Sequence, residues 1–312
     1  MRLFLIALLC SAIWTLSAAP QVANKSPAND PSVATHRGIA LVESGRCREA
    51  LPLLKRWIPH LNDKQLRYSG GMAEARCAMA MDEESTAVEV LVALKRDFPD
   101  DPQVLYITTH YYSELATRAS QQLAAKAPNS YQARRLEAEA LESQAKWDQA
   151  IGVYNGILKE NSQIPGIHYR LGQALLSRAG ASGHVEEAKA EFEKELVVDP
   201  HNAAAEFVLG ELARRAGQWN EAAQHFSNAT KLDVGFSEAY LALGMSLAAA
   251  GKYPDAISPL RSYVQMQPAD AAGHYQLAIA YARVGNKEGA ARELALQNEA
   301  SAHNQDNQTG PP

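Results

Sequence analysis

Two histidines at equivalent places in similar stretches are the first residues whose type and spacing could carry chemistry. His168 and His274 each precede a tyrosine, in HYRLG and HYQLA, near the expected start of a helix. Such a pair of imidazoles could contact a ligand. The similarity of the surrounding residues instead favours inheritance with a repeat, at a helix start. His184 lies alone in a glycine-rich insertion, and a lone histidine does not make a metal site.

Acidic residues just after this insertion are the second candidate. Glu186, Glu187 and Glu191 could act as paired carboxylates, but they also suit a helix beginning, where negative charge complements the helix dipole. The sequence has no GxGxxG, phosphate-binding loop, HExxH or nucleophile elbow. We therefore predict a protein that is not an enzyme, with no cofactor and no metal. A reactive pair formed only on folding, such as His184 with Glu186, is the enzymatic alternative.

Cys47 and Cys77 could be joined in a disulfide if the chain reaches an oxidising compartment. They could equally be two small buried hydrophobic residues on packed helices, which is how free cysteine commonly behaves. The sequence leaves both possibilities open. Neither cysteine has further ligands at the spacing of a zinc site.

The first twenty residues, MRLFLIALLCSAIWTLSAAP, contain one arginine, an apolar run and small residues at the end. This order is typical of a secretory signal peptide. We predict a signal peptide at residues 1–23 and a polar leader at 24–30, with the protein in the periplasm, at the cell surface or secreted. An uncleaved membrane anchor is the alternative, and membrane association is expected only through this segment.

The charge distribution argues against nucleic acid as a partner. Removing Arg2 with the signal leaves 29 basic and 35 acidic side chains, a net charge of −6 (29 − 35). These charges do not gather into the basic stripe that phosphate binding needs. The hydrophobic fraction of 46% supplies ample material for a core.

The elements that must position these residues recur with a fixed period. Alanines mark it at intervals of 34 residues: Ala188, Ala222, Ala256 and Ala290. Each period holds two apolar runs of helical spacing, with a glycine turn between them and often a proline at the end. One helix pair cannot bury its whole apolar face, so the pairs must stack.

Small residues let two antiparallel helices cross closely. We expect Gly210 to face Ala222 at such a crossing, and Phe226 to fill the space toward the next helix. Gly244 stands in the corresponding place one period later. The chemistry of these positions is therefore steric.

These positions resemble the tetratricopeptide repeat. The residues that carry the resemblance are Leu209, Gly210, Ala213, Gly217, Trp219, Ala222, Phe226 and Ala229, then Leu243, Gly244, Gly251, Tyr253, Ala256, Leu260 and Pro268, then Leu277, Ala278, Tyr281, Gly285 and Ala290. The resemblance implies an all-α fold, a right-handed superhelical α-solenoid of stacked antiparallel helix pairs over residues 31–298. It is best over 165–298, and a disordered tail is expected at 299–312.

Eight units are expected, the first three with the weakest match. They cover residues 31–62, 68–99, 101–128, 131–162, 165–200, 203–234, 237–268 and 271–298. The unit at 101–128 is about five residues short.

The resemblance also implies a binding surface, because the first helix of each unit lines a concave groove in this family. The positions expected there are Arg135, Glu139, Tyr169, Gln173, Phe207, Glu211, Arg214, Arg215, Leu241, Met245, Tyr275, Ile279 and Arg283. The lysines and asparagines that clamp acidic chaperone termini are missing from these places.

We therefore predict an exported, non-enzymatic scaffold whose groove holds a protein or peptide segment. The alternative is an accessory protein of envelope assembly or polysaccharide export that binds glycan, with Tyr169, Phe207 and Tyr275 stacking on sugars.

Overall fold

The computed structural model describes residues 30–178 and 183–309, and the side chains only as far as residue 302. The expected signal peptide at 1–23 and nearly all of the expected leader lie outside the described residues. Over the described ranges the regular structure is helical, with 15 α-helices and one short 3-10 turn. None of these helices combines the length and apolar character needed to cross a membrane. The expected all-α fold of packed helix pairs is confirmed.

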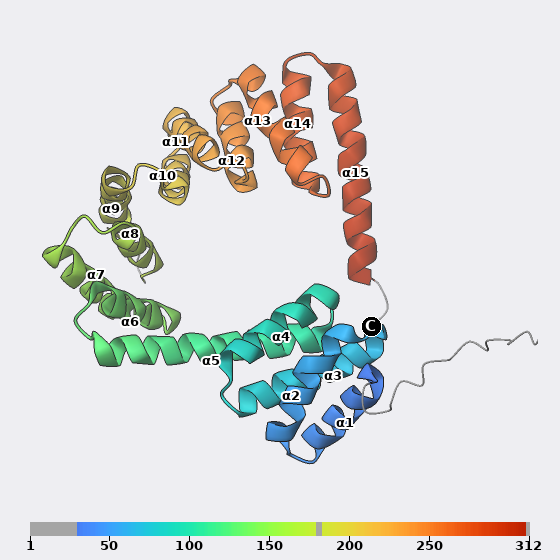
Figure 1. The fold of residues 1–312 in the computed structure, drawn as a ribbon. Helices are drawn as coiled ribbons and strands as arrows, with labels where there is room; N and C mark the ends of the chain where they lie inside the picture. Colours follow the sequence, from blue (N-terminus) through green and yellow to red (C-terminus); the bar gives the residue numbers. More distant parts are fainter. Residues whose placement is uncertain (1–29, 179–182, 310–312) are drawn as a thin grey trace, which may run out of the picture. The chain divides into compact units, whose positions relative to one another are not determined.

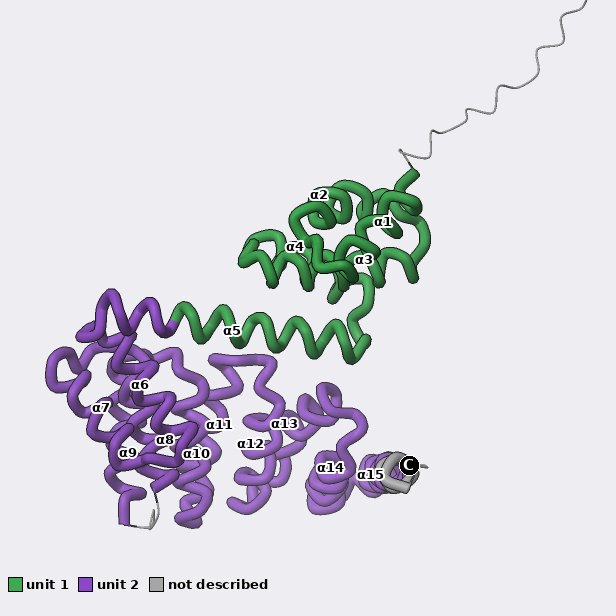
Figure 2. The backbone as a smooth tube through the Cα atoms, turned by 90° about the horizontal axis from the view of Figure 1, so that it is seen from below, with its two compact units in different colours: residues 1–119 green, residues 120–312 purple. Residues whose placement is uncertain are grey.

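The chain divides into two compact units, residues 1–119 and 120–312 (Figure 2). The helices of the first unit are α1 (Pro31–Glu43), α2 (Cys47–Trp57), the turn η2 (Ile58–His60), α3 (Lys64–Ala80), α4 (Glu84–Asp97) and the start of α5 (Pro102–Lys126). Asp30 and Asp63 cap α1 and α3 by accepting hydrogen bonds from backbone amides of the first turn. Leu54, Leu91 and Val104 contribute to the core of this unit.

Residues 101–128 are the first correction to the sequence prediction. A shortened helix pair was expected there, but the segment forms the single helix α5. Between Pro102 and Lys126 the sequence contains no glycine or further proline, so nothing ends the helix where a turn was expected.

The second unit contains five consecutive helix pairs, coloured from green to red in Figure 1. They are α6 (Tyr131–Ser143) with α7 (Trp147–Glu160), α8 (Ile167–Ser177) with α9 (Val185–Val198), α10 (Ala203–Arg215) with α11 (Trp219–Leu232), α12 (Ser237–Ala249) with α13 (Tyr253–Met266), and α14 (Ala271–Arg283) with α15 (Lys287–Thr309). Within this unit the pairs follow a curved path, with α6, α8, α10 and α12 toward its inner side (Figure 1).

Glycine permits close helix crossings within the pairs, as expected, but Gly210 packs against Phe226 rather than against Ala222. A Cβ atom on Gly210 would lie 2.7 Å from Cε1 of Phe226, and one on Gly172 would lie 2.8 Å from Cζ of Phe192. Thus the aromatic ring itself occupies the space that glycine leaves, rather than pointing only toward the next helix. Phe226 and Phe192 are fully buried as a result.

The C-terminal segment is the second correction. A disordered tail was expected from residue 299, whereas α15 continues to Thr309. The sequence after Gly289 has no glycine or proline until Gly310 and Pro311, so the helix meets no breaker earlier.

Candidate functional site

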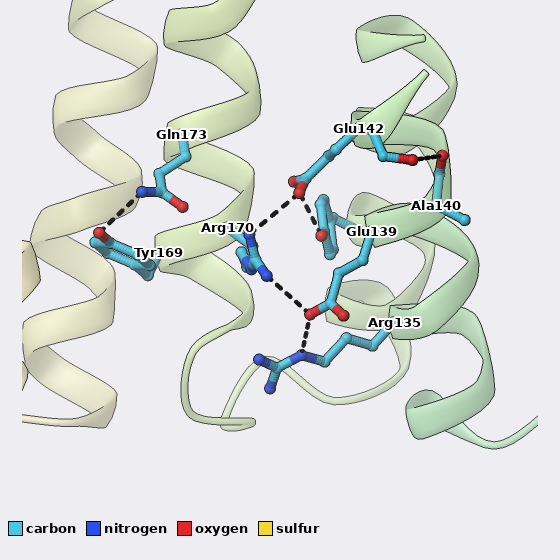
Figure 3. Close-up of polar contacts among 9 residues, drawn as sticks. Arg135, Glu139, Ala140, Glu142, Tyr169, Arg170 and Gln173 are labelled. Atoms are coloured by element: carbon cyan, nitrogen blue, oxygen red, sulfur yellow. Dashed lines mark hydrogen bonds and ion pairs between the residues drawn. The ribbon is translucent and has the colours of Figure 1, made fainter. Parts of the chain in front are cut away.

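An ion-pair network joins α6 to α8 where the sequence predicted a binding surface (Figure 3). The guanidinium of Arg170 donates through Nη2 to Glu139 at 3.1 Å and through Nη1 to Glu142 at 3.2 Å. Arg135 donates through Nε to the same carboxylate of Glu139 at 3.0 Å. Arg135 and Glu139, expected to face a partner, are therefore partly engaged with each other and with Arg170.

A buried tyrosine anchors this network from α7. The hydroxyl of Tyr154 donates to Glu142 at 3.0 Å, and its side chain is fully buried. Burial, followed by the nearby carboxylate of Glu142, raises the pKa of Tyr154 well above its ordinary value. Tyr154 therefore stays a hydrogen-bond donor and fixes the position of Glu142.

Tyr169 and Gln173, on the next part of the expected surface, pair with each other (Figure 3). The amide of Gln173 donates to the hydroxyl of Tyr169 at 2.9 Å, and the Tyr169 ring lies edge-on to Phe192, with 5.6 Å between centroids. Burial raises the pKa of Tyr169. Its ring is therefore a packing element between α8 and α9.

The start of α8 is bonded by the carboxylate of Glu195, a residue that was not predicted from the sequence. Glu195, fully buried on α9, accepts hydrogen bonds from the backbone amides of Gly166 at 2.7 Å and Tyr169 at 3.1 Å. It also accepts one from the side chain of Asn202 at 3.2 Å. Because these amides have no partner inside the helix, Glu195 acts as a cap supplied by the neighbouring helix.

On α10 the expected residues divide into packed and exposed ones. Phe207 lies between Phe226 and Phe236, with ring centroids 5.4 and 4.8 Å away. Glu211 forms a two-bond ion pair with Arg214 at 2.8 and 2.9 Å. Arg215 is exposed at the end of the helix.

The expected residues of α12 and α14 form an apolar area that is partly exposed. Tyr275 is 49% exposed and Met245 is 36% exposed, while Leu241 and Ile279 are half-buried. Arg283 is exposed at the end of α14, and its guanidinium lies 5.4 Å from the centre of the Tyr253 ring. We call Leu241, Met245, Tyr275 and Ile279 the inner apolar surface.

The two histidines occupy equivalent structural places, and both ring nitrogens of each are bonded within the chain. His168 bonds through Nδ1 to Glu191 at 2.6 Å and through Nε2 to the carbonyl of Ser162 at 3.2 Å. His274 repeats this with Glu293 at 2.8 Å and the carbonyl of Pro268 at 3.1 Å. Both rings are buried. Each one joins the first helix of a pair to the second and to the preceding loop.

The remaining candidates are also placed by the structure. His184 contacts Glu187 at 3.1 Å, rather than the Glu186 of the enzymatic alternative. Cys47 and Cys77 are joined in a disulfide, with their Cα atoms 5.2 Å apart. Over the described residues, histidine, cysteine and carboxylate side chains form no group of three or more that could hold a metal ion.

A family profile described as the tetratricopeptide repeat matches residues 174–235 and 241–301. Over these two ranges the sequence is similar to tetratricopeptide repeats. The matched ranges begin near the end of α8 and extend into α15, so they include the inner apolar surface. Arg170, Glu139 and Glu142 lie before them.

Several solved structures have a similar fold. A MamA protein superposes with a TM-score of 0.51 at 18% identity, over 58% of this chain and 96% of that chain. A MamA RS-1 double mutant gives 0.51 at 17% identity, over 59% and 98%. YrrB, a tetratricopeptide repeat protein with an unusual peptide-binding site, gives 0.50 at 23% identity, over 58% and 92%. At these identities the likeness shows the fold alone, and no curated protein matches the sequence.

Proposed function

We propose that this protein is an exported scaffold that binds a segment of another protein on the inner apolar surface, without making or breaking covalent bonds. The observation that carries this proposal is the exposure of Met245 and Tyr275 beside the half-buried Leu241 and Ile279. Exposed aromatic and long aliphatic side chains that lie together are typical anchors for a protein partner. The peptide-binding site named for YrrB supports this use of the fold.

The contrast between paired and unpaired charged side chains supports the region from α10 to α14 as the binding surface. On α6 and α8 the charged groups are paired with each other through Arg170. Arg215 at the end of α10 and Arg283 at the end of α14 are exposed, and neither has a carboxylate partner among the described residues. A partner segment with apolar side chains and flanking acidic residues would therefore complement this area.

The disulfide in the first unit supports export. Disulfides form and persist in oxidising compartments and are rare where thiols are kept reduced. The Cys47–Cys77 bond is consistent with the signal peptide expected from the sequence. The glycan alternative has weaker support, because Phe207 and Tyr169 pack inside the fold and Tyr275 alone offers a half-exposed ring.

Site-specific photo-crosslinking tests the proposed surface. A photoreactive residue at Ala282, exposed on α14, should capture a discrete partner from an envelope extract, and Met245→Glu with Tyr275→Ala should abolish that product. The same photoreactive residue at Gln224, exposed on α11, is the control. Identical products from both positions, or products that survive the double substitution, would contradict the proposal. Binding to a glycan array in the absence of protein products would favour the glycan alternative.

A further inference from the structure

Two adjoining cavities lie between α7 and α9. These are the second helices of neighbouring pairs (Figure 1). Their volumes are about 470 and 400 Å³. Leu158, Val197 and Val198 line the first, and Ile151 and Leu175 line the second. Asn155, Glu191 and Lys194 line both. The two cavities therefore form one continuous groove, which we call the outer groove.

The outer groove is built by three helices. Its floor comes from one face of α8, where His168, Leu171 and Leu175 follow helical spacing. Among the described side chains, no ion pair joins α7 to α9, whereas Lys189 of α9 bonds Glu221 of α11 at 2.9 Å. The space between α7 and α9 thus stays open, while the next such space is bridged.

Two glycines on α7 are not crowded by any neighbouring side chain that the structure describes. A Cβ atom on Gly152 or Gly156 would meet no other atom within 4 Å, unlike Gly172 and Gly210, whose places are crowded by an aromatic ring. Glycine is a poor helix former, so an interior pair four residues apart weakens α7. A smooth backbone strip of this kind permits close approach by another molecule.

The rim of the outer groove combines an exposed apolar residue with positive charge. Val197, which lines the first cavity, is 78% exposed. Lys159 is exposed and has no carboxylate partner among the described residues, whereas Lys194 bonds Glu191 at 2.6 Å. Glu191 also bonds His168, and Glu187, which lines the second cavity, contacts His184 at 3.1 Å, so both carboxylates of the lining are engaged within the chain. Arg178 of the same lining pairs with Asp148 at 2.8 Å.

We propose that the outer groove binds an amphipathic helix of a partner protein that carries acidic residues beside its apolar face. Gly152 and Gly156 lie on α7 outside the lining of the two cavities, and they leave the backbone there free of side chains that a second helix would meet. Aliphatic side chains of that helix enter the two cavities against Leu158, Val197 and Leu175. Acidic residues beside them pair with Lys159 and Lys194. This surface is separate from the inner apolar surface.

A peptide selection tests the proposal directly. A phage library of 18-residue amphipathic helices, with aliphatic positions at helical spacing and the flanking positions randomised, is panned against the full chain. Enriched sequences are expected to carry acidic flanks. The affinity of one labelled peptide is then measured by fluorescence anisotropy against the variants.

Asn155→Trp should weaken binding at least tenfold, because Asn155 is exposed and lines both cavities, so a large ring there fills the groove without entering the core. Lys159→Glu should have a similar effect through charge reversal. Gln224→Trp, an equally exposed change on α11 outside both cavities, should leave affinity unchanged. Circular dichroism confirms that each variant is folded.

The result separates this proposal from the proposed function. Met245→Glu with Tyr275→Ala should leave peptide affinity unchanged, since those residues belong to the inner apolar surface. Failure to enrich any helix above the Asn155→Trp background would overturn the proposal. Enriched helices that bind Asn155→Trp as tightly as the unaltered chain would overturn it too. If such helices no longer bind the variant with Met245→Glu and Tyr275→Ala, their binding site is the inner apolar surface.

Discussion

Ala145 occupies the left-handed backbone region that Gly217 occupies in an equivalent turn two repeats later. Ala145, between α6 and α7, has a φ of 57°, and Gly217, between α10 and α11, has a φ of 75°. Gly251 and Gly285 take the same conformation in the following repeats, at 78° and 82°. Glycine enters this region without steric cost, whereas a residue with a Cβ atom is strained by roughly 1–2 kcal/mol.

Ala145→Gly should therefore stabilise the second unit by about 0.5–1 kcal/mol, the strain relieved less the extra freedom of glycine in the unfolded chain. Gly217→Ala should destabilise it by about 1 kcal/mol or more. The midpoint of urea unfolding, followed by circular dichroism, measures both changes. Equal effects in the same direction would show that the backbone angle of this turn is not what decides its stability.

The turns illustrate what the sequence could predict. Steric rules act over a few residues, so the glycines and alanines of the period were sufficient to place the helix pairs from α6 to α15. The helix α5 was not predicted, because its apolar spacing is compatible with a shortened repeat, although the segment has no glycine or proline after Pro102 to end a helix. Local residue types thus predict the helix pairs, and the absence of a helix breaker within α5 indicates a single helix.

The candidate site was less predictable, because contacts between helices depend on packing. Phe207 has the spacing of a surface residue, but the ring of Phe236 from the loop before α12 covers it. Arg170 stands beside an expected surface residue, and only the placement of α6 shows that it reaches Glu139 and Glu142. Such relationships span some thirty residues and have no local signal.

Arg170 should matter to the second unit more than a charge pair within one helix. Arg170→Met leaves Glu139 and Glu142 without their shared partner, and we expect a loss of about 1–2 kcal/mol, because the network is only partly shielded from water. The matched control is Arg214→Met, whose partner Glu211 lies three residues earlier on α10, with an expected loss of about 0.3–0.5 kcal/mol. Equilibrium unfolding in urea compares the two, and equal losses would contradict a bridging role for Arg170.

Glu74 should make the first unit less stable as pH rises. Its carboxyl group is buried on α3, and burial raises its pKa to about 7, with Lys55 opposing the shift and Glu89 adding to it. Between about pH 4.5 and 7 the folded chain keeps a proton that the unfolded chain has released, so stability falls over that window. Above about pH 7 the carboxyl group is ionised in the folded chain as well, and the free-energy cost of burying this charge is then complete.

Glu74→Gln removes this ionisation. The variant should be more stable than the unaltered chain by about 1–3 kcal/mol at pH 8, and the difference should shrink toward pH 5. Thermal unfolding at pH 5, 6, 7 and 8 measures the difference between the two proteins. Glu43→Gln, at an exposed position on α1, is the control and should give no such trend. A difference that stays constant with pH would show that Glu74 is not the responsible group.

The disulfide should stabilise the first unit by restricting its unfolded state. Cys47 and Cys77 are 30 residues apart, and a loop of this length corresponds to about 3–4 kcal/mol. Replacing both by alanine should expose peptide bonds between residues 30 and 100 to limited proteolysis, and leave residues 131–302 protected. Reduction of the unaltered chain should have the same effect. Unchanged cleavage in both cases would contradict a stabilising role for this bond.

Gly156 links the stability of α7 to the binding proposed for the outer groove. Because a Cβ atom there meets nothing, Gly156→Ala should stabilise the second unit by about 0.5–1 kcal/mol through helix propensity alone. The same methyl group would stand in the path of a docking helix, so the affinity for a selected peptide should fall. Gly152→Ala should behave alike, whereas Ser227→Ala on α11 should leave affinity unchanged. Chemical unfolding and fluorescence anisotropy on one preparation give both quantities. A gain in stability without loss of affinity would mean that the glycines do not serve binding. A surface kept open for a partner should gain stability and lose affinity on substitution, whereas a helix that merely tolerates glycine should only gain stability.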